Sequence, residues 1–198
     1  MPKLTGAFEL FKNLDLIPAE NISRWTKNRS NLTQIRNFLG NRLLYPQTVA
    51  ASLMDLENDL AILKEGIRAE PQSIYVSGTK KIILPKKLLL RFPSPKILMV
   101  TLVQFLPLKG LTTVFIEDER SGLNKAGSIY TPENPSLLKD PSLININGQS
   151  SQFNIGSIAA FPFSDHHLKV SINGGLEIEV SGGIMGFAID LRGKTDGG

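Results

Sequence analysis

The sequence contains no cysteine, which excludes disulfide bonds, thiolate metal sites and cysteine nucleophiles. Its two histidines, His166 and His167, are adjacent in the chain. Neighbouring side chains in a strand point to opposite faces of the sheet, so these two imidazoles cannot bind one metal ion together. The chain offers no further His or Cys to complete a zinc site. We therefore expect neither a metal nor another cofactor.

Motifs of catalysis are also missing. No Gly-x-Ser-x-Gly turn presents a serine that either histidine could activate. The pairs Gly174-Gly175 and Gly182-Gly183 fall where β turns are expected, and neither opens a helix whose N-terminus could hold a phosphate. No complete Gly-x-x-x-x-Gly-Lys-Ser/Thr phosphate loop is present. These absences predict that the protein is not an enzyme.

Long apolar runs are absent too. The longest uncharged one, Ile97–Leu108, has 12 residues and includes Pro107. It is too short to span a bilayer as a helix, and a buried strand is the better interpretation. Met1–Glu9 contains no apolar run of the kind that signal peptides require, so we expect the protein not to be secreted. The composition, 41% hydrophobic and 20% charged over 198 residues, is that of a globular protein with one substantial core.

The first third of the chain carries helix signals. Ser30 or Asn31 is placed to cap a helix over Leu32–Leu39 that ends near Gly40. Pro46 precedes a second helix, in which apolar residues recur at spacings of 4, 3, 4, 3 and 4, an a/d pattern. The residues of this stripe are Val49, Leu53, Leu56, Leu60, Leu63 and Ile67. The stripe either packs on the protein's own body or joins two copies, and the second alternative predicts a homo-oligomer.

From Ser73 onward the pattern changes to short apolar runs separated by turn residues. Strands are expected at Ser73–Ser77, Lys80–Leu84, Lys86–Phe92, Ile97–Leu106 and Leu111–Glu117, followed by a long connection over Ser121–Pro141 with a short strand at Ser128–Tyr130. Near the C-terminus Asn173-Gly174 separates two alternating runs, which is a strong hairpin signal. Ser181-Gly182-Gly183 is expected to turn the chain into a third strand, Ile184–Asp190.

The order of these elements predicts the α+β class. We expect N-terminal helices over residues 1–71, followed by an antiparallel β-sandwich or jelly-roll-like domain over residues 72–198. A parallel α/β fold is disfavoured, because the expected helices come first and do not alternate with the strands.

The net charge of +4 is unevenly distributed. Residues 1–98 carry 15 Lys or Arg and 8 Asp or Glu, whereas residues 99–198 carry 7 and 10. A basic stretch without acidic residues consists of Lys80, Lys81, Lys86, Lys87, Arg91 and Lys96. With apolar residues interleaved, it is typical of a surface that binds single-stranded nucleic acid without reading its sequence, or anionic lipid. The alternative is a sheet edge decorated with lysine to prevent edge pairing.

One segment resembles a known family. The strand-like run Val114–Arg120, VFIEDER, ends in Asp118, one further residue and Arg120, and a short loop leads to Ala126–Tyr130. This arrangement resembles the signature region of the thirty-kilodalton superfamily of plant-virus movement proteins, and the likeness extends roughly from Leu84 to Arg192.

That resemblance implies a β-sandwich related to viral jelly-roll capsids. It also implies sequence-nonspecific binding of single-stranded RNA, and a place in the host cytoplasm, at plasmodesmata or at the membrane periphery. Asp118 matches the characteristic aspartate of the family, with a structural or transport role rather than a catalytic one. The alternatives are a viral structural protein that self-assembles, either a matrix protein or a small jelly-roll capsid subunit, and a cellular lipid-binding or adaptor domain.

Overall fold

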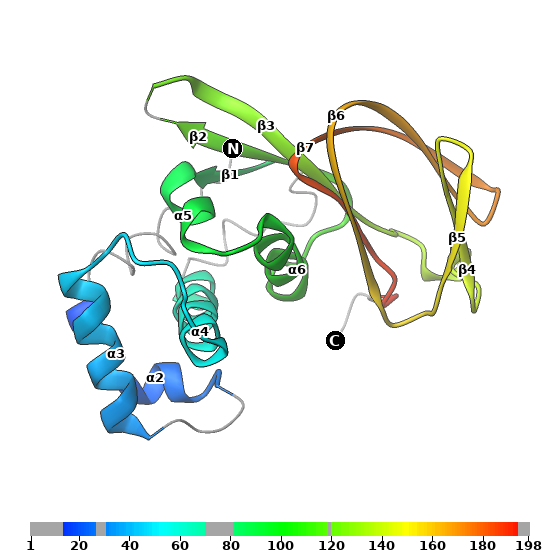
Figure 1. Cartoon of the computed structure of the whole chain (residues 1–198). Helices are drawn as coiled ribbons and strands as arrows, with labels where there is room; N and C mark the ends of the chain where they lie inside the picture. The colour runs from blue at the N-terminus through cyan, green and yellow to red at the C-terminus, as the bar shows by residue number, and fades with distance from the viewer. Residues whose placement is uncertain (1–13, 27–30, 70–80, 119, 194–198) are drawn as a thin grey trace.

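The computed structural model describes residues 14–26, 31–69, 81–118 and 120–193 (Figure 1). Helical segments come first: η1 (Leu14–Leu16), α2 (Ala19–Ser23), α3 (Leu32–Leu44) and α4 (Leu53–Ala69). They are followed by a sheet that is mostly antiparallel. The predicted α+β class, with N-terminal helices and a sandwich-like β domain, is thereby confirmed.

The capping of α3 follows from its sequence. The Asn31 side chain accepts a hydrogen bond from the backbone N–H of Thr33 at 2.9 Å, so Asn31, one of the two predicted caps, is the N-cap. Ser30, the other predicted cap, lies outside the described residues. The helix continues past Gly40 to Leu44, because Ile35, Leu39 and Arg42 keep a buried face at helical spacing. The predicted end near Gly40 is wrong for that reason.

Helix α4 begins at Leu53, four residues after the first member of its apolar stripe. The Ser52 hydroxyl accepts a hydrogen bond from the backbone N–H of Asp55 at 3.1 Å, and the Asp55 carboxylate accepts one from Ala51 N–H at 3.3 Å. Reciprocal bonds of this kind fix the first turn of a helix. Val49 therefore belongs to the connection between α3 and α4.

Within the described residues the sheet has seven strands, in the order β1-β2-β3-β7-β6-β4-β5. Their bounds are β1 (Lys81–Pro85), β2 (Gly110–Asp118), β3 (Gly122–Thr131), β4 (Ser142–Ile146), β5 (Gln149–Phe153), β6 (Ile158–Ile172) and β7 (Leu176–Asp190). The pairs β1–β2 and β3–β7 are parallel, and the other pairs are antiparallel. β1 confirms most of the strand predicted at Lys80–Leu84, while Ser73–Ser77 lies outside the described residues.

Two predicted strands are helices. Lys86–Phe92 is mostly α5 (Lys86–Arg91), and Ile97–Leu106 is mostly α6 (Pro95–Phe105). The start signals were present in the sequence: a proline precedes α5, and the Ser94 hydroxyl caps α6 by accepting from Lys96 N–H at 3.3 Å. An apolar run without alternation does not distinguish a buried helix from a buried strand.

These two helices also alter the topology. They lie between β1 and β2, which are parallel, and parallel neighbours need a crossover connection of this kind. The expectation that helices do not alternate with strands is therefore wrong at this one place. The helices α5 and α6 lie beside the sheet on the side where α4 also packs (Figure 1).

The C-terminal strands are longer than predicted. The Asn173-Gly174 hairpin is confirmed, with Ile172 opposite Leu176. β7 then runs without a turn through the Ser181–Gly183 segment, so the predicted three-strand meander is wrong. A Cβ at Gly183 would lie 2.3 Å from the carbonyl oxygen of Ala126, which shows that the glycine permits close backbone packing rather than a turn. Likewise β3 occupies much of the connection expected over Ser121–Pro141.

The core consists of two apolar clusters. The first joins residues of η1, α2, α3 and α4 to α5, α6 and one face of the sheet. The second lies within the curved sheet, on β3, β4, β6 and β7, and includes the fully buried Phe187. No helix in the described ranges is long and apolar enough to cross a membrane.

Candidate nucleic-acid interface

The lysines of the basic stretch are carried by three consecutive elements. Lys81 begins β1, Lys86 and Lys87 begin α5, and Lys96 is in the first turn of α6. All four side chains are exposed, whereas Lys80 lies outside the described residues. The apolar residues interleaved with them are mostly buried: Ile82, Ile83, Leu84, Leu88, Leu89 and Phe92. The exposed lysines therefore lie on elements whose apolar side chains are mostly packed in the core.

Lys86 is paired with an acidic group. Because β1 runs parallel to β2 with Pro85 opposite Glu117, the start of α5 lies beside the end of β2. Lys86 Nζ is 2.6 Å from Asp118 Oδ2, with side chains that are 50% and 17% exposed. The carboxylate neutralises part of the charge that Lys86 would offer to a polyanion.

Asp118 is the residue that the family resemblance singles out. Besides the Lys86 ammonium, it accepts a hydrogen bond from the backbone N–H of Arg120 at 3.1 Å. These two donors, Lys86 first, lower the pKa of Asp118 from 3.8 to about 2. The carboxylate thus fixes the turn between β2 and β3 and holds α5 against it. Arg120 is exposed, and it donates this hydrogen bond from its backbone rather than from its guanidinium group.

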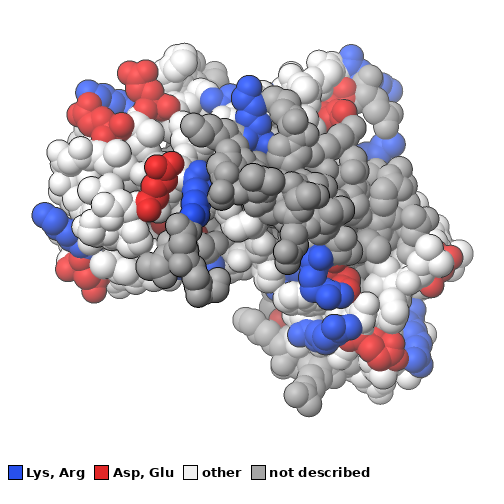
Figure 2. Space-filling model, turned by 180° about the vertical axis from the view of Figure 1, so that it is seen from behind, with Lys and Arg blue, Asp and Glu red and all other residues white. Residues whose placement is uncertain are grey.

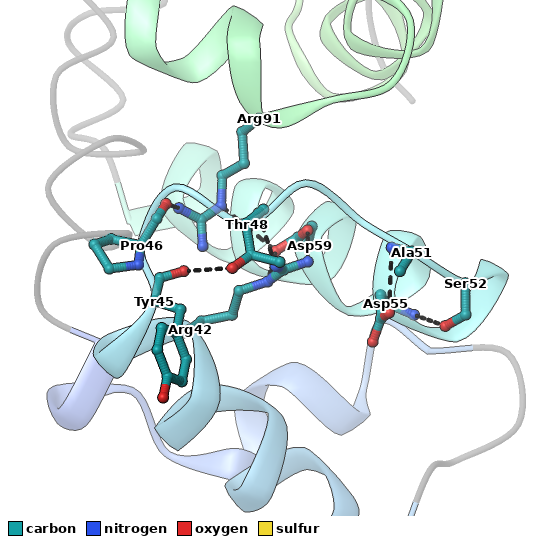
Figure 3. A network of polar contacts seen from close by, with 9 residues as sticks. All are labelled: Arg42, Tyr45, Pro46, Thr48, Ala51, Ser52, Asp55, Asp59 and Arg91. Carbon is teal, nitrogen blue, oxygen red and sulfur yellow. Dashed lines mark hydrogen bonds and ion pairs between the residues drawn. The ribbon is translucent and has the colours of Figure 1, made fainter.

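Arg91 does not lie with the lysines. Its side chain is 8% exposed, with Nε 3.5 Å from Asp59 Oδ1 and Nη1 donating to the carbonyl of Pro46 at 3.0 Å (Figure 3). Burial lowers its pKa, which the Asp59 carboxylate opposes. Arg91 is therefore a core residue and is excluded from the candidate interface.

A second arginine meets the same carboxylate. Arg42 donates to Asp59 through Nε at 3.2 Å and Nη2 at 2.7 Å, and to the carbonyl of Thr48 through Nη1 at 2.7 Å (Figure 3). Burial raises the pKa of Asp59, and the two guanidinium groups oppose that rise. This network holds the connection between α3 and α4 against α5.

The apolar stripe of α4 is divided between core and surface. Val49 and Leu53 are 42% and 82% exposed, whereas Leu63 and Ile67 are buried. Leu56 and Leu60 are half-buried and pack on the first core cluster. The second half of the stripe thus serves the protein's own core and is unavailable to a second copy.

The end of α3, the start of α4 and the connection between them expose further apolar side chains. Leu44, Tyr45 and Met54 are 71%, 66% and 48% exposed. Residues 43–54 contain no charged side chain. We call this uncharged segment, residues 43–54, the uncharged corner; the Arg42–Asp59–Arg91 network binds it at the carbonyls of Thr48 and Pro46.

The distribution of charge on one face is visible in Figure 2. On the described residues of that face, Lys and Arg stand in small groups, most of them beside Asp or Glu. The His167 side chain is exposed on β6, and the His166 side chain is not among those that the structure describes. Within the described ranges, no three His, Asp or Glu side chains are arranged to hold a metal ion.

Comparison with known proteins gives no relative for this chain: no family model, no curated protein and no solved structure matches it.

Proposed function

We propose that the chain binds single-stranded nucleic acid, without reading its sequence, through the exposed lysines of β1, α5 and α6. The observation that carries this proposal is that Lys81, Lys87 and Lys96 are exposed, while most of the apolar residues between them are buried. Each lysine that contacts a phosphate releases counterions from the nucleic acid, so binding weakens as salt is raised. Lys86 contributes less, because Asp118 competes with phosphate for its ammonium group.

The biological role within this proposal is that of a movement protein. A protein that coats single-stranded RNA and aids its passage between cells needs binding, assembly and attachment to host structures, and no catalysis. The resemblance around Asp118 supports this role. The bonds of that aspartate to Lys86 and to the Arg120 N–H support a positioning role for it.

The proposal is tested by titration of the protein with labelled single-stranded RNA at several salt concentrations. Lys87→Glu should weaken binding and flatten the dependence of log K on log salt by about 0.7 for each phosphate that the side chain no longer neutralises. Lys139→Glu is the matched control, since Lys139 is an exposed lysine of the connection between β3 and β4. Equal RNA affinity for Lys87→Glu and Lys139→Glu would remove this lysine surface from the proposal.

A second candidate function is that of a matrix-like structural protein at an anionic membrane. The uncharged corner favours it, because exposed leucine and tyrosine side chains insert at a lipid surface. Anionic liposomes titrated in parallel distinguish the two functions. Liposome binding that Leu53→Asp abolishes, without RNA binding, would replace the nucleic-acid proposal by this one.

A further inference from the structure

The two edges of the sheet differ. In the strand order β1 and β5 are the outermost strands. Ile82, Ile83 and Leu84 of β1 are buried, whereas Gln149–Gln152 of β5 are exposed. Among the described strands β5 pairs with β4 alone. β5 therefore presents an open row of backbone donors and acceptors, far along the strand order from the lysines on β1.

β5 carries none of the features that usually protect an edge. Natural sheets block their edges with charged residues, proline, bulges or covering segments. Residues 141–164 contain no Asp, Glu, Lys, Arg or His, and β5 itself, Gln-Ser-Ser-Gln-Phe, contains no proline. Its pairing with β4 runs in register from Ile146–Gln149 to Ser142–Phe153 without a bulge. An edge of this kind is a template for a further strand.

The direction of its backbone groups is set by β4. Asn147 N–H donates to the Lys169 carbonyl at 3.1 Å, and the Leu143 carbonyl accepts from Asn173 N–H at 2.7 Å. The backbone N–H and C=O groups of odd-numbered residues in this part of the chain thus point to β6, so those of Ile144 and Ile146 point to β5. On β5, Ser151 and Gln149 pair with these two residues, and their backbone groups point back to β4. The N–H and C=O groups of Ser150 and Gln152 consequently point outward from the edge.

We propose that β5 pairs antiparallel with β5 of a second copy of this chain, about a two-fold axis through Ser151. Only this register aligns all residues of both strands while matching outward groups with outward groups. Ser150 and Gln152 of one copy then exchange backbone hydrogen bonds with Gln152 and Ser150 of the other. Ser151 lies opposite its own copy as a non-hydrogen-bonded pair, about 4.5 Å apart at Cα.

Electrostatics and size favour a second copy as the occupant. Two basic molecules repel each other, but the paired β5 strands themselves carry no charged side chain. For the same reason it offers nothing to select a charged peptide. The serines at the centre of the strand are small enough to lie opposite each other. A contact through one five-residue strand buries less area than a standard interface, which buries about 800 Å² per partner, so we expect a dimer that dissociates on dilution.

Cysteine cross-linking tests the register, because the natural chain has no cysteine. Ser151→Cys places two thiols across the axis within the Cα separation that disulfides accept, about 4.4–6.8 Å. Ser150→Cys is the matched control, since Cα atoms of Ser150 and its copy would be about 8 Å apart along neighbouring strands. Under mild oxidation we expect Ser151→Cys to form covalent dimers at least tenfold faster. Equal cross-linking rates for both variants would overturn this register.

The mass in solution tests the dimer itself, in the absence of RNA. We expect the wild-type mass to rise from 21.7 kDa toward twice that value with concentration. Gln152→Pro removes an outward N–H and leaves the ladder with β4 intact, so it should stay monomeric with an unchanged thermal midpoint. Leu53→Asp, on the uncharged corner, should dimerise as the wild type does. A monomeric wild type at every concentration, or dimers that disappear in Leu53→Asp and persist in Gln152→Pro, would refute the proposal without touching RNA binding.

Discussion

The ammonium group of Lys86 lies 2.6 Å from the Asp118 carboxylate and joins the first turn of α5 to the end of β2. Residues 32 positions apart meet here because β1 and β2 are parallel and in register. Asp118 therefore accepts a hydrogen bond from the turn that follows β2 and also neutralises part of the charge of the Lys86 ammonium group. This pairing makes two predictions, one on titration and one on RNA affinity.

The first prediction concerns acid titration. The pKa of Asp118 is about 2 in the folded protein, below its ordinary value of 3.8. A depressed carboxyl pKa means that the stabilisation is present above about pH 3.8 and is lost as the pH falls through about 2. In carboxyl NMR spectra Asp118 should titrate near pH 2, and Lys86→Met should move its midpoint toward 3.8. An unchanged midpoint in Lys86→Met would contradict the pairing.

The second prediction concerns RNA. Asp118→Asn retains a side-chain oxygen for the Arg120 N–H and removes the charge that neutralises Lys86. RNA affinity at low salt should rise, and the salt slope should steepen by about 0.7 if Lys86 gains one phosphate partner. Glu179→Gln, on an exposed residue of β7, removes the same charge far from Lys86 and should leave the slope unchanged. A slope in Asp118→Asn equal to that of the control would show that Lys86 does not meet RNA.

The third prediction concerns the buried network. Asp59→Ala leaves the Arg42 and Arg91 guanidinium groups buried without their carboxylate, and breaking a buried pair in this way costs about 3–5 kcal/mol. Urea unfolding should show this decrease in stability. Asp55→Ala, in the first turn of the same helix, removes the hydrogen bond from Ala51 N–H and should cost about 1 kcal/mol. Equal costs for the two variants would mean that the network does not stabilise the folded state.

The overall class was predictable from the sequence because its strongest signals are local. The Asn31 cap and the Asn173-Gly174 hairpin depend on residues within a few positions of one another, and both are present. Helix α6 was not predicted, since Leu98, Met99 and Leu102 are buried by the sheet and by α4 rather than by neighbours in the sequence. Its apolar composition fits a buried strand as well as a buried helix.

The candidate interface was predictable only in part, for a similar reason. The exposure of Lys81 and Lys87 agrees with their placement on a basic surface. The burial of Arg91 could not be inferred, because its partner Asp59 lies 32 positions earlier, on a helix whose packing the sequence leaves open. Nor could the pairing of Lys86 with Asp118, which requires the parallel register of β1 and β2.

The fourth prediction separates core from surface on α4. Leu63 is fully buried, so Leu63→Ala should cost about 2–5 kcal/mol of unfolding free energy. Leu53 is 82% exposed, so Leu53→Ala should change stability by no more than about 0.5 kcal/mol. Denaturant unfolding of both variants measures the difference. Similar costs at the two positions would indicate that the whole stripe is equally buried, as in a helix packed against a second copy.

The fifth prediction uses two glycines with opposite expected effects. Gly186 has φ +82°, and a Cβ there would lie 2.1 Å from the carbonyl oxygen of Phe161 on β6. Gly186→Ala should therefore cost at least about 1–3 kcal/mol, because both the backbone conformation and the neighbouring strand resist it. Gly40 lies inside α3 with no atom within 4 Å of its Cβ position, so Gly40→Ala should stabilise the protein by about 0.5–1 kcal/mol. Thermal unfolding of the two variants should shift in opposite directions, and a stabilising Gly186→Ala would mean that β6 and β7 do not approach this closely.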